Sequence, residues 1–100
     1  MRPVEFREAL AIGTRLTLFS RDKPDRVFTV IKFWVDETLG ASLQLSSGVP
    51  CYQVADEEGR IDLLLHLAIE EVNENRWCLW RPDQAGLDSR SISNVAVVEN

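Results

Sequence analysis

Histidines, cysteine clusters and glycine-rich loops are nearly missing from this chain, and their scarcity excludes several kinds of site. The 100 residues include a single histidine, His66, so a histidine metal cluster cannot form. The two cysteines, Cys51 and Cys78, lack metal-ligand spacing and are expected to be buried free thiols, although sequence separation leaves a bridge between them open. The five glycines are isolated, so no phosphate-binding loop is visible. We therefore expect neither a metal nor a cofactor.

Long apolar runs are missing as well. No window approaches the roughly eighteen apolar residues that a transmembrane helix needs. The first ten residues, MRPVEFREAL, carry charges where a signal peptide has its apolar centre. These features predict a cytoplasmic protein with no membrane partner, and the length suits one domain over residues 1–100.

Charge is distributed unevenly along the chain. The net charge is −5, and residues 36–75 hold nine Asp or Glu against one basic residue, Arg60. An acidic balance disfavours nucleic acid as a partner, because binding phosphates requires basic residues. Two interpretations of the acidic middle stay open. The acids either line solvated turns or form a surface that imitates nucleic acid.

The N-terminal segment carries helix signals. Pro3 suits the first turn of a helix, and Gly13 can end one in a left-handed conformation. Val4 and Leu10 would then lie near one side. We expect a helix over residues 1–12.

Alternating and β-branched residues predict strands over residues 13–80. The segment 26–36, RVFTVIKFWVD, is apolar on both faces and is expected to be a central strand covered on both sides. Residues 42–46 alternate and predict another strand. Residues 51–56 predict a strand that continues through an acidic turn closed by Gly59 into a hairpin.

Residues 61–72 fit two templates. As a helix, the segment would be capped by Asp62; as a strand, Leu63 and Leu65 would share a face. We favour a strand through Leu64, a tight helical turn, and a further strand over residues 69–72.

The fold class is predicted to be α+β and mostly β. We expect an N-terminal helix packed on a small, strongly bent antiparallel sheet or an SH3-like barrel. The strand order over residues 13–80 is similar to that of SH3-like barrels, which implies a fold but no activity. Residues 81–94 are expected to form a loop and residues 95–98 a closing strand.

No catalytic constellation is visible, so we expect a protein that is not an enzyme. The sequence has no G-x-S-x-G motif, and neither cysteine has a histidine nearby in sequence. His66 could act as a general base only if Asp62 or Glu70 oriented it, which a helix would allow.

Aromatic residues are the best candidates for recognition, because aromatic side chains and arginine are enriched at the centres of interfaces. The candidate binding residues are Trp34, Tyr52, Trp77, Trp80 and Arg81. We expect a protein-interaction module that binds a protein partner or itself, with a homodimer as one form. The alternative is an acidic inhibitor or decoy of a nucleic-acid-handling protein, of the kind phage or mobile elements encode.

Overall fold

The structure is a computed structural model that describes residues 1–20, 23–45, 47–80, 90–92 and 94–99. These residues form a mostly β fold with one short helix, α1 (Glu37–Ser42). The strands are β1 (Arg2–Pro3), β2 (Arg15–Ser20), β3 (Lys23–Asp36), β4 (Val49–Asp56), β5 (Ile61–Ile69), β6 (Glu74–Trp80), β7 (Arg90–Ile92) and β8 (Asn94–Val97).

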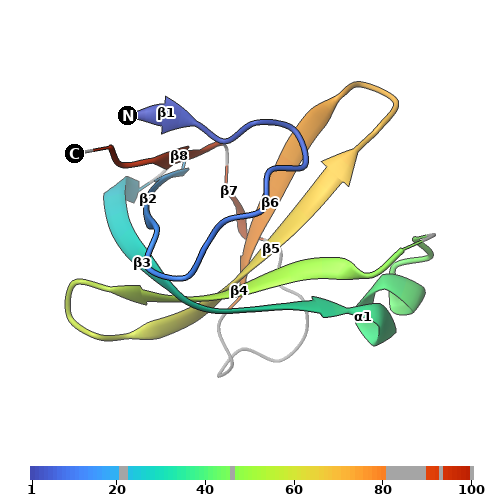
Figure 1. Cartoon of the computed structure of the whole chain (residues 1–100), viewed down its shortest axis with the longest axis horizontal. Coiled ribbons are helices and arrows are strands. Elements are labelled where there is room, and N and C mark those ends of the chain that lie inside the picture. The colour runs from blue at the N-terminus through green and yellow to red at the C-terminus, as the bar shows by residue number, and fades with distance from the viewer. Residues whose placement is uncertain (21–22, 46, 81–89, 93, 100) are drawn as a thin grey trace.

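All these strands belong to one antiparallel sheet in the order β1-β8-β2-β3-β4-β5-β6-β7. Figure 1 shows the sheet strongly bent, with both termini at the same end, where β1 pairs with β8. The mostly β class and the bent sheet are confirmed. The described strands do not close into a barrel, because no ladder joins β1 to β7. Of the two expected architectures, a strongly bent sheet or an SH3-like barrel, the described strands form the bent sheet and not the barrel.

The main core lies on one face of the sheet, which we call the inner face. Side chains alternate along each strand, so the strands from β2 to β6 send every second residue to this face, except where the register shifts in β2 and β3. The buried residues of this cluster are Leu10, Leu16, Leu18, Phe28, Val30, Tyr52, Val54, Leu64, Trp77, Leu79 and Val95. The apolar alternation read from the sequence therefore supplies most of the core.

A second, smaller cluster lies on the opposite face, which we call the outer face. Its buried centre is Val49, Cys51 and Leu65. Around this centre pack partly buried residues, which are Trp34, Leu39, Leu63, Leu67 and Cys78. We call these eight residues the outer cluster. Leu39 comes from α1, so the helix helps to cover this end of the sheet.

The expected N-terminal helix is wrong. After β1, residues 4–13 cross the sheet as an extended and turning segment, which we call the N-terminal strap (Figure 1). Arg7 has a φ of 63°, which no α-helix allows. A helix this short is not stable in isolation, because it contains too few hydrogen bonds to offset the cost of nucleation. Val4 and Leu10 instead gain burial by packing on the inner face.

The expected strand over residues 42–46 is also wrong, because a helix takes the residues before it. The Asp36 carboxylate caps α1 by accepting a hydrogen bond from the Leu39 amide at 2.9 Å. Gly40 is needed inside this turn, since a Cβ there would collide with the Ser47 carbonyl oxygen. Leu43 and Leu45 alternate but are both exposed. In the described part of the chain, no helix is long and apolar enough to cross a membrane.

Residues 61–69 form one continuous strand, so the helical turn expected after Leu64 is wrong. β5 pairs with β4 on one side and with β6 on the other, and these two ladders bond its backbone. Because β5 packs on both faces, its sequence is mostly apolar, and such a run fits a helix as well as a strand. Near the C-terminus, residues 90–92 of the expected loop form β7. The closing strand expected over residues 95–98 is present as β8, one residue earlier. Residues 81–89 lie outside the described residues.

The alternation of β5 is tested by a pair of truncations. Leu64 is completely buried and Ile61 is 50% exposed, although both are branched aliphatic residues of the same strand. We expect Leu64→Ala to lower the free energy of unfolding by about 2–5 kcal/mol, because it removes packed methyl groups and leaves a cavity. Ile61→Ala should change it by less than about 1 kcal/mol. Urea unfolding of both variants measures this, and equal losses would contradict the strand.

Candidate protein-interaction site

The structure separates the predicted binding residues. Tyr52 and Trp77 are only 1% and 3% exposed and belong to the inner core. Trp34 is half-buried on the outer face. Trp80 is the last residue of β6 and stands opposite Leu63 in the ladder, but its side chain lies outside the described residues, as does Arg81. Of the described side chains in this set, Trp34 alone reaches the surface substantially.

Trp34 lies in a long strand whose register changes in the middle. The pairing of β3 with β4 shifts between Val30 and Lys32, so Ile31 is an extra residue opposite β4. Beyond this bulge, Trp34 stands opposite Cys51 and joins the outer cluster. The Lys32 ammonium lies 5.5 Å from the centre of the Trp34 ring, a cation–π contact on the same face.

β3 is much longer than its neighbour β2, with 14 residues against six. On the β2 side, the last backbone bonds are those from the Gly13 amide to the Val30 oxygen, at 2.7 Å, and from the Val30 amide to the Thr14 oxygen, at 2.9 Å. Past Val30 the N-terminal strap leaves β3. Among the described residues, none pairs with β3 on this side beyond that point. We call residues 31–36 the open edge.

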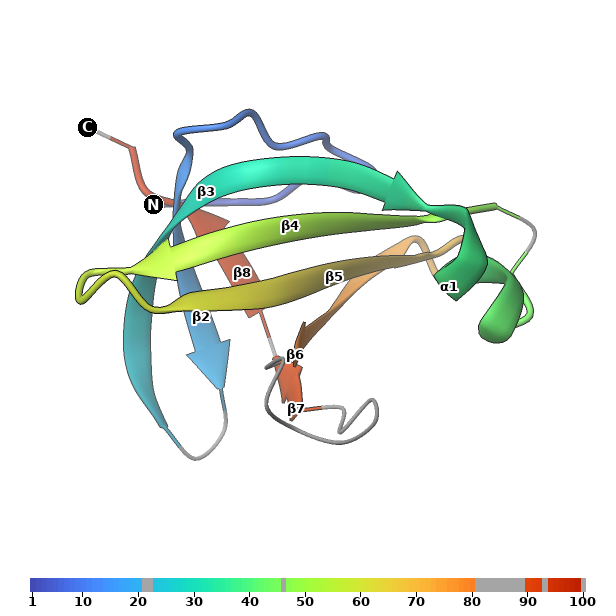
Figure 2. The same ribbon diagram turned by 90° about the horizontal axis from the view of Figure 1, so that it is seen from below.

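The open edge is apolar and exposed. Ile31, Phe33 and Val35 are 39%, 39% and 52% exposed. Figure 2 shows β3, β4 and β5 side by side between the β4–β5 turn and α1, with β3 the outermost of the three. Strand edges present unpaired backbone donors and acceptors to which another strand can add. This edge therefore combines backbone hydrogen-bonding groups with exposed apolar side chains. The expectation that both faces of residues 26–36 are covered is wrong for residues 31–36.

Sequence reasoning identified Trp34 but missed its three neighbours Ile31, Phe33 and Val35 as surface residues. The apolar pattern on both faces resembles that of a fully paired central strand. Two signals pointed the other way. Lys32 interrupts the apolar run, as is common in edge strands, and the segment is longer than any strand predicted beside it.

His66 is buried on the inner face, where it packs against Trp77 and bonds Asn75. Its ring stacks on Trp77 with centroids 4.0 Å apart and planes 6° from parallel. Its Nε2 lies 2.7 Å from Asn75 Oδ1. Because the Asn75 amide nitrogen donates to the backbone oxygens of Val4 and Glu5, Oδ1 must accept, and Nε2 carries the proton. Burial lowers the pKa of His66, and the bond to Asn75 opposes this shift.

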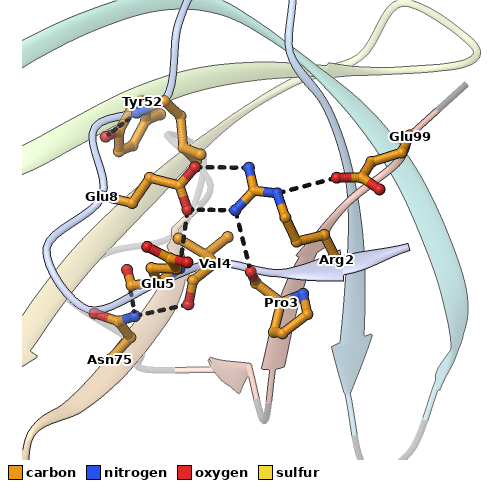
Figure 3. A network of polar contacts seen from close by, with 9 residues as sticks. Arg2, Pro3, Val4, Glu5, Glu8, Tyr52, Asn75 and Glu99 are labelled. Atoms are coloured by element: carbon orange, nitrogen blue, oxygen red, sulfur yellow. Dashed lines mark hydrogen bonds and ion pairs between the residues drawn. The ribbon is translucent and has the colours of Figure 1, made fainter.

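The strap is held by side chains of the sheet (Figure 3). Asn75 bonds the oxygens of Val4 and Glu5 at 3.1 and 3.0 Å, and the Tyr52 hydroxyl accepts from the Leu10 amide at 3.1 Å. Arg2 forms a two-pronged ion pair with Glu8, at 2.7 and 2.8 Å. His66, Asn75 and Tyr52 thus position this segment.

The arrangement required for a His66 general base is not present. That layout placed Asp62 or Glu70 one helical turn away. In the observed strand, the four residues from Asp62 to His66 span roughly 13 Å, and Glu70 lies in the turn after β5, where it forms an ion pair with Arg7. His66 is 3% exposed and bonds Asn75 instead. In the described part of the chain, no group of three or more His, Cys, Asp or Glu side chains could hold a metal ion.

The cysteines are free and sit on either side of Leu65, which pairs with both. Two strand spacings separate them by roughly 10 Å, more than a disulfide spans. Burial, helped by the negative charge of Asp36, raises the pKa of the Cys51 thiol to about 11. Cys51 is therefore an inert packing residue.

The acids of residues 56–74 lie around two hairpin turns, except for Asp62, which is buried within β5. Glu57 and Glu58 occupy the β4–β5 turn, while Glu70, Glu71 and Glu74 surround the β5–β6 turn. These turns lie at opposite ends of the nine-residue β5, roughly 30 Å apart. The described acids therefore do not form the single face that imitation of nucleic acid requires.

Similarity to known proteins does not assign this site. The chain matches no family model, no curated protein and no solved structure in the three comparisons. The open edge and Trp34 are therefore interpreted from their own geometry.

The His66 environment predicts a pH dependence of stability. Because the folded-state pKa of His66 lies below its ordinary value of 6.5, the unfolded chain binds more protons in the interval between the two values. The free energy of unfolding should be unaffected by His66 above pH 6.5 and should fall as the pH decreases through that interval. Chemical unfolding between pH 8 and 5 measures this slope.

His66→Gln provides the control for that slope, since glutamine does not titrate. The variant should be less stable at all pH values but should lose most of the dependence between pH 6.5 and 5. Glu8, whose pKa the Arg2 guanidinium holds below its ordinary value of 4.5, acts only at lower pH. An unchanged slope in His66→Gln would contradict the assignment.

Asn75 is expected to be the main anchor of the strap. Asn75→Ala removes two bonds to strap carbonyls and leaves His66 Nε2 without its acceptor, so the free energy of unfolding should fall by about 1–3 kcal/mol. Glu74→Ala, at an exposed neighbouring position, is the matched control and should have little effect. Comparable values for the two variants in urea unfolding would argue against the anchor.

Proposed function

We propose that this chain is a cytoplasmic, non-enzymatic protein-interaction module that binds an extended protein strand along the open edge of β3. The observation that carries this proposal is that β3 beyond Val30 pairs, among the described residues, with β4 alone and leaves its other side open, with Ile31, Phe33 and Val35 all exposed. An added strand would receive main-chain hydrogen bonds from the edge and side-chain contacts on both faces.

The two faces of the edge offer different contacts. On the inner face, Phe33 and Val35 stand opposite Tyr52 and Pro50, and the Phe33 ring packs 4.9 Å from the ring of Tyr52. The partner would therefore meet an apolar surface that the core already supports. On the outer face it would meet Trp34 and the charged end of Lys32. This combination supports recognition of a strand with alternating apolar residues.

The predicted aromatic site contributes to this proposal in part. Trp34 is itself a residue of the open edge, whereas Tyr52 and Trp77 lie in the inner core behind it. Trp80, at the end of β6, lies three strands away from β3 in the sheet order, and Arg81 follows it in the chain. The separated acidic turns give the decoy alternative no specific support, so the interaction module is the function we carry forward.

Site-specific crosslinking tests the proposal. A photoreactive phenylalanine analogue at Ile31 or Val35 should form adducts with an identifiable protein, which includes another copy of this chain, in the cells from which the chain comes. The same analogue at Val72, which is 59% exposed in the β5–β6 turn, is the control and should form none. Equal adducts from all three positions, or none from Ile31 and Val35, would refute the function.

A further inference from the structure

The open edge has a sequence that is complementary to itself. Residues 32–36 read Lys-Phe-Trp-Val-Asp, with a positive charge at one end, a negative charge at the other and an aromatic residue in the middle. An antiparallel copy of this segment, turned about a two-fold axis at Trp34, places each Lys32 opposite the Asp36 of the other chain. Directly opposite side chains lie on the same face of a sheet and interact in pairs.

From this we infer that the strand added to β3 is the same segment of a second copy, so that two sheets join into one across a two-fold axis at Trp34. The inference rests on the proposed function, whose partner it names. In this register Lys32 faces Asp36 of the other copy twice, Trp34 faces Trp34, and Phe33 faces Val35 twice. Such an interface is isologous, as most homodimer interfaces are.

The faces of the observed sheet agree with these pairings. Lys32, Trp34 and Asp36 stand opposite Gln53, Cys51 and Val49, which puts all three on the outer face. Phe33 and Val35 lie together on the inner face, where both are exposed. The two ion pairs and the aromatic pair would thus share one face, and the apolar pairs the other.

The register centred on Trp34 is the one that pairs all of residues 32–36 and brings the two opposite charges together. Moving the axis to Phe33 would pair the bulged Ile31 with Val35 and would leave Asp36 opposite Val30, which already bonds Thr14 and Gly13 on that side. Moving the axis to Val35 would place Lys32 opposite Thr38, which belongs to α1. Lys32 and the bulge at Ile31 also discourage indiscriminate strand addition, since an unpaired edge lysine opposes it. The Lys32–Asp36 pairing removes that opposition for this partner.

The two charges allow a reciprocal test by light scattering on a sizing column, at one total concentration. The unaltered chain should have twice the mass of a monomer. Lys32→Asp and Asp36→Lys, each alone, should raise the dissociation constant by about tenfold, because two attractive cross-strand pairs become two repulsive ones. An equimolar mixture of the two variants should recover the dimer, since in the mixed pair each acidic side chain at these positions again faces a basic side chain of the other chain.

Two controls separate charge from folding. Arg15→Asp makes the same kind of change at an exposed position of β2, which is paired on both sides, and should leave the dimer intact. Asp36→Asn keeps an acceptor for the Leu39 amide and removes only the charge, so it should weaken the dimer less than Asp36→Lys does.

A monomeric unaltered chain would overturn the inference, as would single variants that dimerise like the unaltered chain or a mixture that stays monomeric. The proposed function has a separate outcome. If the chain is monomeric but Val35 forms adducts with a different protein, the proposed interaction module stands and the homodimer is refuted. If the chain is monomeric and forms no adducts, both the proposed function and the homodimer are refuted.

Discussion

The structure depends on the length of β3, which is more than twice that of the strand β2 beside it. Its first half pairs with β2 and β4 and sends Phe28 and Val30 into the inner core. After the bulge at Ile31, its second half pairs, within the described residues, with β4 alone and points toward α1. The same strand thus supplies the centre of the fold and an exposed edge, because a partner that ends early leaves backbone groups without bonds.

The N-terminal strap decides where that edge begins. Its last residue, Gly13, and the following Thr14 both bond Val30. The preceding residues of the strap lie away from β3 on the inner face, where Asn75 and Tyr52 hold them. The lone histidine serves this arrangement by bonding Asn75 and stacking on Trp77. His66, which the sequence offered as a possible general base, therefore has a structural role. A buried imidazole that donates to an amide oxygen stabilises packing without needing a charge.

Much of the fold could be predicted from residue patterns. The alternation at Leu16 and Leu18, and at Tyr52 and Val54, identified strands that bury one side. The hairpin closed by Gly59 is present, with that glycine at a φ of 85°. The errors have a common cause. The N-terminal segment, residues 42–46 and the end of β5 each carry patterns that suit two structures, and long-range contacts chose between them.

The amino-acid sequence by itself determined which residues are apolar, which segments extend and where turns occur, because these follow from side-chain chemistry and local backbone preferences. It also set the order Lys-Phe-Trp-Val-Asp that makes residues 32–36 complementary to themselves. Only the tertiary structure decided that Tyr52 and Trp77 lie inside while Ile31, Phe33 and Val35 lie outside. Exposure depends on which strand stands beside β3, and that choice is made by contacts between residues distant in the chain.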